Sequence, residues 1–517
     1  MAELLTTIND TIWSTPLVML FLAAGIFFTL RTGLIQVLGL PDFFRQIRRE
    51  KASQDGLSPF QTLMVSMAAR VGIGNIAGVA TAIAFGGPGA VFWMWVMGFL
   101  GAATSFIECT LAQIYKERDP ETGQYRGGPA FYIEKAYAHT KAAPILKILA
   151  LVVAAIHAIA TIFFLPSMQA NGIANAVTTV WHLDARLIGL ILALLLAVIV
   201  VGGIQRIAQF ASFIVPFMAS TYIIIALIIM LSHATRIPEV CELIFKSAFG
   251  KEEIFAGITG SAFAWGIRRG VYSNEAGQGN GAMFAGSAEV SHPVKQGFVQ
   301  AVSVYVDTLL VCSATAFIII STDMFNVYSS TDASGNTPLL YHGALGDNTP
   351  AGPNYVQAGL DTFIAGTGPA FVAIAICFFG FTSAVACYYL AETNLSFLLR
   401  SGVKRRGYGT QLPRVAAPFS QRISFSRRIA QGTIIAAMFI GATSTPGAAW
   451  LLGDIGMGSL AWFNLIIIVA LHRVVITALK DYRLQRAQGL DPQFHPKKLG
   501  IKNAEFWVGW RGYKRRF

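Results

Sequence analysis

The stretch Met67-Ala-Ala-Arg-Val-Gly-Ile-Gly-Asn-Ile-Ala-Gly78 interrupts a long apolar segment with glycines and polar residues at its centre. Further along the chain, a second apolar segment is interrupted by Trp265-Gly-Ile-Arg-Arg-Gly-Val-Tyr-Ser-Asn-Glu-Ala-Gly-Gln-Gly279. A helix that breaks inside lipid must find partners for the backbone groups it frees, and a protein-lined cavity supplies them. Paired interruptions in the two halves of such a chain are typical of the binding site of a secondary transporter. The two stretches therefore predict two broken membrane helices around one site.

The composition also favours an integral membrane protein. Of the 517 residues, 54% are hydrophobic and only 13% are charged, and the mean hydropathy is +0.56. A soluble domain carries about 25% charged residues. The net charge of +12 would suit a nucleic-acid partner, but the basic residues lie in short segments between apolar runs. Membrane topology explains that pattern better, so no nucleic-acid partner is predicted.

Apolar runs near the length that crosses a bilayer, about 20 residues, recur along the whole chain. They predict an all-α integral membrane protein with about eleven transmembrane helices, two of them broken. The predicted spans are 12–31, 59–85 (broken), 90–115, 145–165 with a polar continuation to about 180, 185–204, 210–232, 253–285 (broken), 295–322, 367–395, 428–446 and 449–472.

The basic residues predict how the chain is oriented. In an arrangement of eleven spans, the segments after the first, third, fifth and ninth spans fall on one side together with the basic tail. The loop 323–366 on the opposite side contains no Lys or Arg. By the positive-inside rule, the N-terminus is outside the cell and the C-terminus is cytoplasmic.

Without the first span, ten helices remain in two groups of five, and each group opens with a broken helix that enters from the opposite side. This is the 5+5 inverted repeat of LeuT-type transporters, with one extra N-terminal helix. The alternative is that the glycines only allow close helix packing, which would not require Arg70, Asn75 and Glu275 beside them. The predicted regions are the N-terminal helix and cytoplasmic loop 1–58, the first repeat 59–232, the second repeat 253–472, and the basic cytoplasmic tail 473–517.

Three motifs resemble one known family, the alanine or glycine:cation symporters (sodium:alanine symporters). They are Gly72-Ile-Gly-Asn-Ile-Ala-Gly-Val-Ala-Thr-Ala-Ile-Ala-Phe-Gly-Gly-Pro-Gly-Ala-Val-Phe-Trp-Met-Trp95, Gly127-Gly-Pro-Ala-Phe-Tyr132 and Arg269-Gly-Val-Tyr-Ser-Asn-Glu-Ala-Gly277. The similarity extends from about residue 12 to 475. It implies a LeuT-like fold and import of small neutral amino acids, alanine or glycine, with Na⁺ or in some members H⁺. It also implies a bacterial or archaeal plasma membrane, the inner membrane in a Gram-negative cell.

A sodium ion prefers oxygen ligands, and unwound backbone supplies them without a fixed charge. The first break offers such carbonyls, and Phe379-Gly-Phe-Thr-Ser383 resembles the segment whose hydroxyl pair completes a sodium site in LeuT-like transporters. The alternative is that the two hydroxyls bond back to carbonyls of the preceding helical turn. The predicted sodium ligands are the carbonyls of Ala68, Val71 and Phe379 and the hydroxyls of Thr382 and Ser383.

The substrate is a zwitterion and needs both donors and acceptors. Free N–H groups at the start of a half-helix suit a carboxylate, carbonyls of the second break suit an ammonium group, and Gln169 is placed to reach the cavity from the fourth span. Two aromatic side chains are predicted as walls of the pocket. The predicted substrate-binding residues are Gly72, Ile73, Gly74, Asn75, Phe164, Gln169, Trp265, Gly266 and Ile267.

Charged residues inside spans are functional candidates by default, because burying them in lipid is costly. An Arg–Glu pair bridging the broken helices, as a fixed ion pair or as a gate on one side, would explain the arginines, and Glu275 is also a candidate proton carrier. The charged or titratable residues concerned are Arg70, Arg268, Arg269, Glu275, Asp307, His157 and Glu108.

The sequence predicts no enzyme and no organic cofactor, with Na⁺ as the coupling ion. We find no Walker-type glycine loop, no His-Glu-x-x-His pair and no Gly-x-Ser-x-Gly elbow. The alternatives that remain are a proton-coupled amino-acid symporter and an ion channel.

Overall fold

The computed structural model describes residues 2–49, 56–119, 122–329, 339–346, 349–363, 365–400 and 417–508. Most of these residues are helical, as predicted, and their strands form two short two-stranded sheets. Parts of two predicted basic segments, 401–416 after the ninth span and 509–517 at the end of the tail, lie outside the described residues.

The N-terminal region is helical from its second residue. It contains α1 (Ala2–Ile12), α2 (Thr15–Thr32), α3 (Ile35–Leu38) and α4 (Leu40–Arg49). Gly33 adopts φ of +66° after α2, where its N–H and that of Leu34 bond back to the last turn of the helix. This left-handed residue ends α2 and turns the chain toward α4.

The helix of the first break starts at a clear sequence signal. Ser58 Oγ accepts from the Gln61 N–H at 3.1 Å, and Gln61 Oε1 accepts from the Ser58 N–H at 3.0 Å. This reciprocal cap precedes Pro59, a residue suited to the first helical position. The elements that follow are α5 (Pro59–Arg70), the 3₁₀ turn η1 (Ile73–Asn75), α6 (Ala77–Gly86), α7 (Gly89–Ile114), β1 (Glu117–Arg118), β2 (Tyr125–Arg126) and α8 (Pro129–Ala136).

The next segment contains the first of two π-helices. It comprises α9 (Ala143–Ile159), the π-helix η2 (Ala160–Phe164), α10 (Leu165–Trp181), α11 (Ala185–Val200), α12 (Gly203–Ser232), η3 (Ala234–Arg236), α13 (Ile237–Ala248) and η4 (Glu253–Ile258). Helices α9, η2 and α10 run on as one apolar stretch over Ala143–Trp181, which matches the predicted span with a polar continuation.

The C-terminal half contains the second break and the second π-helix. Its elements are α14 (Thr259–Asn274), α15 (Asn280–Gly286), α16 (Pro293–Val304), the π-helix η5 (Tyr305–Cys312), α17 (Ser313–Ser321), β3 (Asn326–Tyr328), β4 (Leu339–His342), α18 (Pro353–Asp361), α19 (Gly368–Arg400), α20 (Ala417–Thr443), α21 (Pro446–Ala487) and α22 (Glu505–Val508). Helix α21 is much longer than the predicted span 449–472.

Among the described residues, seven helical stretches are long and apolar enough to cross a membrane. An eighth is the pair Pro59–Arg70 and Ile73–Gly86, which passes the same test but is bent by 62° at the break. Helix α11 is apolar but shorter. The predicted count of eleven spans stays a prediction. It would require three more spans: α11, the broken pair of α14 and α15, and α20.

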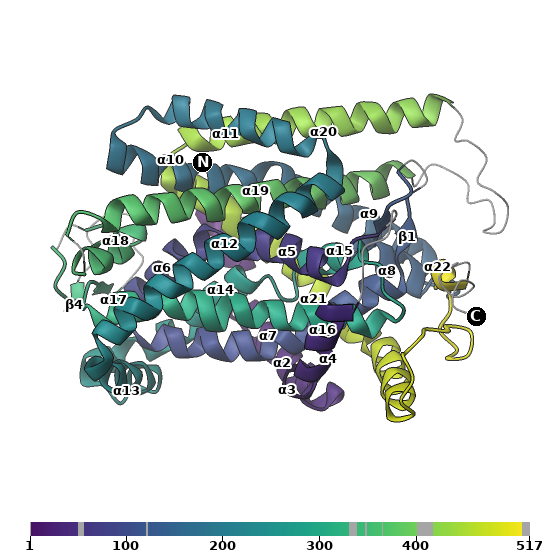
Figure 1. Cartoon of the computed structure of the whole chain (residues 1–517), viewed down its shortest axis with the longest axis horizontal. Coiled ribbons are helices and arrows are strands. Elements are labelled where there is room, and N and C mark those ends of the chain that lie inside the picture. Colours follow the sequence, from purple (N-terminus) through teal and green to yellow (C-terminus); the bar gives the residue numbers. More distant parts are fainter. Residues whose placement is uncertain are drawn as a thin grey trace.

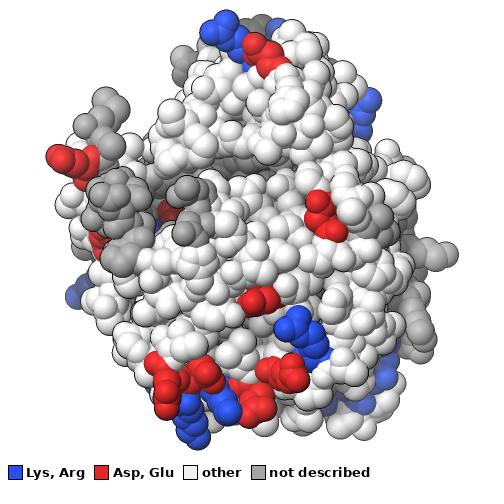
Figure 2. Space-filling view, turned by 90° about the vertical axis from the view of Figure 1, so that its left-hand side faces the viewer, with Lys and Arg blue, Asp and Glu red and all other residues white. Residues whose placement is uncertain are grey.

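The long helices lie roughly side by side along the long axis of the molecule (Figure 1). Helices α10, α11 and α20 form its upper edge and pack on α19, while α7 packs against both α14 and α16. Helix α13, helix α18 and strand β4 gather at the left-hand end, and α8, α22 and β1 gather at the opposite end. Figure 2 shows the left-hand end, which is hollowed and carries both acidic and basic side chains along its lower edge, the edge where α13 lies.

The segment after α21 folds back onto the right-hand end. Asp491 pairs with Lys295 at 2.7 Å, the Phe494 N–H donates to Ser291 O at 3.1 Å, and Trp507 Nε1 donates to Gln113 O at 3.0 Å. Lys116 lies over the rings of Phe506 and Trp507. Residues 488–508 therefore pack on the ends of α7 and α16.

Candidate functional site

The first break lies between α5 and α6, where the glycine-rich sequence predicts it. Its backbone groups are bonded by side chains: the Gly72 N–H donates to Asn75 Oδ1 at 2.9 Å, and the Ile73 N–H donates to Gln169 Oε1 at 3.3 Å. A Cβ at Gly72 would lie 2.9 Å from Ser383 Oγ, and one at Gly74 would lie 3.1 Å from the Tyr272 ring. The two glycines thus allow three other helices to approach the unwound backbone.

The second break lies later in its segment than predicted. Helix α14 continues to Asn274, Glu275 takes φ of +55°, and α15 starts at Asn280. Trp265, Gly266 and Ile267 are inside the continuous helix, so the prediction that their carbonyls are freed by unwinding is wrong. Gly266 instead allows contact with α7, because a Cβ there would lie 2.4 Å from Ala90 O.

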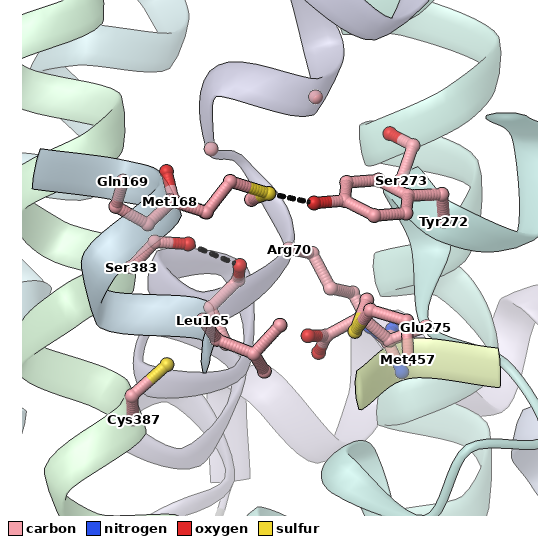
Figure 3. Close-up of a pocket in the computed structure, with 13 residues that line it drawn as sticks. Arg70, Leu165, Met168, Gln169, Tyr272, Ser273, Glu275, Ser383, Cys387 and Met457 are labelled. Atoms are coloured by element: carbon pink, nitrogen blue, oxygen red, sulfur yellow. Dashed lines mark hydrogen bonds between the residues drawn. The ribbon is translucent and has the colours of Figure 1, made fainter. Parts of the chain in front are cut away.

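The two breaks meet around a buried cavity, shown in Figure 3. Gln169 and Ser383 lie on one side of it, and Tyr272 and Glu275 on the other; Tyr272 donates a hydrogen bond to Met168 Sδ across it. These side chains come from α10, α19, α14 and the second break. The lining residues are Ala69, Arg70, Gly72, Gly74, Leu165, Met168, Gln169, Tyr272, Ser273, Glu275, Ser383, Cys387 and Met457.

The two hydroxyls predicted to bind sodium have different partners. Ser383 donates to the Ala69 carbonyl, and this bond joins α19 to the end of α5 at the first break. Thr382 donates to Phe378 O at 2.9 Å and to Phe379 O at 3.1 Å, both in its own preceding turn. Of the five predicted ligands, Ser383 is among the residues that line the cavity. The other four are buried but are not among the lining residues: Ala68, Val71, Phe379 and Thr382.

Only some of the predicted substrate-binding residues line the cavity. Gly72, Gly74 and Gln169 line the cavity. Asn75 points elsewhere: its amide nitrogen donates to Ser273 Oγ at 3.0 Å and to Asp307 Oδ1 at 2.7 Å. Ile73 is buried with its N–H on Gln169.

The two predicted aromatic walls lie outside the thirteen lining residues. Phe164 is in the π-helix η2 beside Gly456 on α21. Trp265 packs on Phe85, with ring centroids 5.1 Å apart, and on Arg268 and Arg269. The aromatic side chain at the cavity is Tyr272, which the sequence does not distinguish from other aromatic residues of the same helix.

The buried charges surround the breaks. The Arg70 guanidinium, at the end of α5, donates to Ser303 Oγ, to Ser105 Oγ at 3.1 Å and to Gln300 O at 3.2 Å. Asp307, in the π-helix η5, accepts from Asn75 and from Ser273 and so joins the first break to α14. Asp307 therefore lies in a π-helix, and π-helices occur frequently at functional sites.

The arginine pair of α14 binds Asp454 on α21. Arg268 Nη2 lies 2.7 Å from Asp454 Oδ2, and Arg269 Nη1 lies 3.1 Å from Asp454 Oδ1. Arg269 also lies over the rings of Trp265, Tyr272 and Trp450. The Arg–Glu pair predicted to bridge the breaks is not formed by these arginines: their acid is Asp454, whereas Glu275 accepts a hydrogen bond from Asn280 at 3.0 Å.

Helices of membrane-spanning length, one of them broken at a buried polar cavity, define a membrane transporter. The chain belongs to the sodium:alanine symporter family, whose model matches residues 1–496. It is 47% identical over 508 residues to the putative sodium/proton-dependent alanine carrier protein YrbD of Bacillus subtilis (strain 168), covering 98% of each chain.

Two further relatives are similar over nearly their whole length. The sodium/proton-dependent alanine carrier protein of Bacillus sp. (strain PS3) is 42% identical over 476 residues, covering 91% of this chain and 98% of its own. The probable sodium/glutamine symporter GlnT of Bacillus subtilis (strain 168) is 38% identical over 502 residues, covering 96% and 94%. The chain is therefore a cation-coupled amino-acid symporter and a multi-pass plasma-membrane protein, and it is not an enzyme.

Proposed function

We propose that this protein imports a small neutral amino acid, alanine or glycine, together with Na⁺ by alternating access. The observation that carries the proposal is the junction of the two breaks, where unwound backbone, the Ser383 hydroxyl and the Gln169 amide face one buried cavity. Such a junction offers both oxygen ligands for a cation and polar groups for a zwitterion. Two relatives named as alanine carriers support alanine as the substrate.

The proposed sodium site lies where α5 ends against α19. The Ala69 carbonyl already accepts a hydrogen bond from Ser383, so oxygen atoms of both helices meet at this point. The proposed ligands are the carbonyls of Ala68, Val71 and Phe379 and the hydroxyls of Thr382 and Ser383. Thr382 would need to turn its hydroxyl away from its own helix to join them, because it now bonds Phe378 and Phe379.

The proposed amino-acid site adjoins the start of η1. We place the carboxylate at the N–H groups of Gly72 to Gly74, where a Cβ would block the approach. The carboxylate would there replace the Asn75 and Gln169 side-chain oxygens that now accept from the Gly72 and Ile73 N–H groups. Tyr272, Met168 and Met457 supply an apolar and aromatic wall close to the breaks. Because these side chains fill most of the space, we expect the site to select a small side chain.

The proposed architecture around this site is the LeuT-type inverted repeat. It has eleven spans, with an N-terminal segment over 1–58, repeats over 59–232 and 253–472, and a cytoplasmic tail over 473–517. The N-terminus is outside, which places the hollowed end shown in Figure 2 outside the cell as well.

Uptake into proteoliposomes tests the proposal. With an inward Na⁺ gradient, labelled alanine should accumulate above its external concentration, and replacing Na⁺ by K⁺ should abolish accumulation. Glycine should compete with alanine, and glutamine should compete poorly. A channel would only dissipate gradients, so uptake that never exceeds equilibrium would contradict symport. Accumulation driven by a proton gradient without Na⁺ would favour the proton-coupled alternative.

A further inference from the structure

One carboxylate faces the cavity where the two breaks meet. Glu275 is only 5% exposed and is the first residue after α14. Figure 3 shows its carboxylate pointing from the second break toward Leu165, on the opposite side of the cavity. The carbonyls predicted to accept from the ammonium group, those of residues 265–267, lie inside a continuous helix. A zwitterion in this cavity therefore needs another acceptor for its positive charge.

The two carboxylate oxygens of Glu275 differ in their partners. Asn280 Nδ2 donates to Oε1 at 3.0 Å, whereas Oε2 is buried and has no hydrogen-bond partner among the described residues. The N–H donor on Oε1 favours the ionised form, and an ionised carboxylate with an unbonded oxygen is costly to bury. Oε2 is therefore an acceptor that a cationic group entering the cavity would satisfy.

The arginines near the cavity are bonded elsewhere. Arg268 and Arg269 pair with Asp454, and both Nη atoms of Arg70 donate to groups on α7 and α16. Among the described residues, none of these three arginines forms an ion pair with Glu275. Arg70 also lines the cavity, so its charge lowers the cost of an ionised carboxylate there without occupying it.

The backbone at Glu275 adopts a conformation that glutamate rarely takes. Its φ is +55°, in the left-handed region, and its N–H donates to Val271 O at 2.9 Å. Glycine is the usual residue where a helix ends in this way. A larger residue held in this region at a cavity points to a use of its side chain.

The end of α14 adds negative partial charge at the same place. In a longer helix, the N–H groups of Ala276 and Gln278 would donate to the carbonyls of Tyr272 and Asn274. Here the Ala276 N–H donates to Asn274 Oδ1 at 2.9 Å, and the Gln278 N–H donates to Glu275 O at 3.2 Å. The last carbonyls of α14 therefore form the negative end of its dipole, which favours a cation. Tyr272, in this last turn, lines the cavity together with Glu275.

The two breaks thus present opposite charges to one cavity. The first break has the N–H groups of residues 72–74, where we place the substrate carboxylate, and the second has Glu275 and the end of α14. An ammonium group carries three N–H donors, which suits a carboxylate oxygen beside helix-end carbonyls. This separation of charge matches the two ends of an α-amino acid.

We propose that the Glu275 carboxylate binds the ammonium group of the transported amino acid through its unbonded oxygen, Oε2. This inference rests on the proposed function and adds to it the group that recognises the amine. Glu275 is then a specificity-determining residue: it selects α-amino acids over acids of the same size that lack a cationic amine.

Binding of alanine and of lactate to the purified full-length protein tests this inference. Lactate has the carbon skeleton of alanine, with a neutral hydroxyl in place of the ammonium group. The rise in melting temperature with increasing ligand, measured in Na⁺, gives both affinities and reports only on folded protein. The wild-type protein should bind alanine at least about tenfold more tightly than lactate, because a hydrogen bond to a charged group is stronger than one to a neutral group.

Two variants of Glu275 separate its charge from its shape. Glu275→Gln keeps the size of the side chain and removes its charge, so alanine affinity should fall about tenfold or more while lactate affinity changes less than twofold. Glu275→Asp keeps the charge and should keep a preference for alanine over lactate. Glu239→Gln, at an exposed position of α13, should leave both affinities unchanged.

Several results would overturn the inference. An equal loss of alanine and lactate affinity in Glu275→Gln would show a structural role only, and alanine affinity within twofold of the wild type would show no role. A higher Na⁺ requirement with the alanine preference intact would assign the carboxylate to the metal ion instead. If neither variant folds, the wild-type protein decides: a preference for alanine supports the inference, and equal affinities overturn it. A wild-type protein that binds no alanine in Na⁺ would contradict the proposed function instead.

Discussion

Ser383 and Thr382 are adjacent on α19, yet their hydroxyls have different partners. Ser383 reaches across to Ala69 at the first break, while Thr382 bonds to its own preceding turn. A motif identifies both residues as candidates, but it does not distinguish a hydroxyl that crosses to another helix from one that bonds within its helix. Only the rotamer does so, and the rotamer depends on packing from distant regions of the chain.

Replacing Ser383 by Ala should raise the Na⁺ concentration that half-saturates alanine uptake. An unmade hydrogen bond or ligand contact costs about 1–3 kcal/mol, which corresponds to roughly five- to a hundredfold in affinity. The measurement is uptake at fixed alanine and increasing Na⁺. Thr382→Val serves as a companion variant: an equal effect supports both ligands, and unchanged Na⁺ dependence of both variants would refute the sodium assignment.

Replacing Gln169 by Ala should weaken alanine binding about tenfold, which corresponds to about 1.4 kcal/mol. Gln169 now accepts the Ile73 N–H, and its loss would leave that buried donor without a partner and enlarge the cavity. Binding to purified protein in Na⁺ measures the effect. Asn175→Ala, further along α10 at an exposed position, is the matched control. A change of less than twofold would place Gln169 outside the functional site.

At the scale of elements, the first break could be predicted closely from sequence and the second only roughly. The first has glycines that lie at the unwound residues themselves. In the second, the glycines at 266 and 270 lie inside α14 and pack on α7, and the chain leaves the helix only at Glu275. A packing glycine and an unwinding glycine look alike in sequence, because the difference lies in the neighbouring helix.

Elements that depend on tertiary context were not predictable. The π-helices η2 and η5 have no signal in the apolar pattern, yet they carry Phe164 and Asp307. The buried charged residues could be identified as functional candidates from the sequence alone, because burying a charge in lipid is costly. Four of these candidates, Glu108, His157, Glu275 and Asp307, lie in a break or form a hydrogen bond to a residue of one.

The first break is expected to require glycine at 72 and 74. Gly72→Ala with Gly74→Ala should strongly reduce alanine binding while the protein still folds, because the new methyl groups would meet Ser383, Gln169 and Tyr272. Thermal stabilisation by alanine in detergent reports only on folded protein. Gly432→Ala on α20, where a Cβ meets nothing within 4 Å, is the control. A normal alanine shift in the double variant would show that these glycines only pack.

At the scale of the whole molecule, the C-terminal segment holds the right-hand end together. The sequence predicts a basic cytoplasmic tail, and within it residues 488–508 carry Asp491, Phe494 and Trp507 onto α7 and α16. Aromatic residues and an acid, and not the basic charge of the segment, make these contacts. The net charge of this segment therefore does not predict which of its side chains pack on the helices.

Ending the chain after Ala487 should lower the melting temperature of the purified protein. The truncation removes the Asp491–Lys295 ion pair and takes two aromatic neighbours away from Lys116. Trp507→Ala should lower the melting temperature less, and Lys498→Ala, at an exposed position, should not change it. A truncated protein that melts at the wild-type temperature would show that the segment contributes nothing to stability.

We propose that Na⁺ and the amino acid bind together where the two breaks meet. Equilibrium binding of labelled alanine to purified protein, measured at increasing Na⁺ with K⁺ keeping ionic strength constant, tests it most directly. If the two sites are coupled, Na⁺ should raise alanine affinity and alanine should raise Na⁺ affinity by the same factor, since coupling between two sites is reciprocal. Alanine binding of equal strength in Na⁺ and in K⁺ would contradict it.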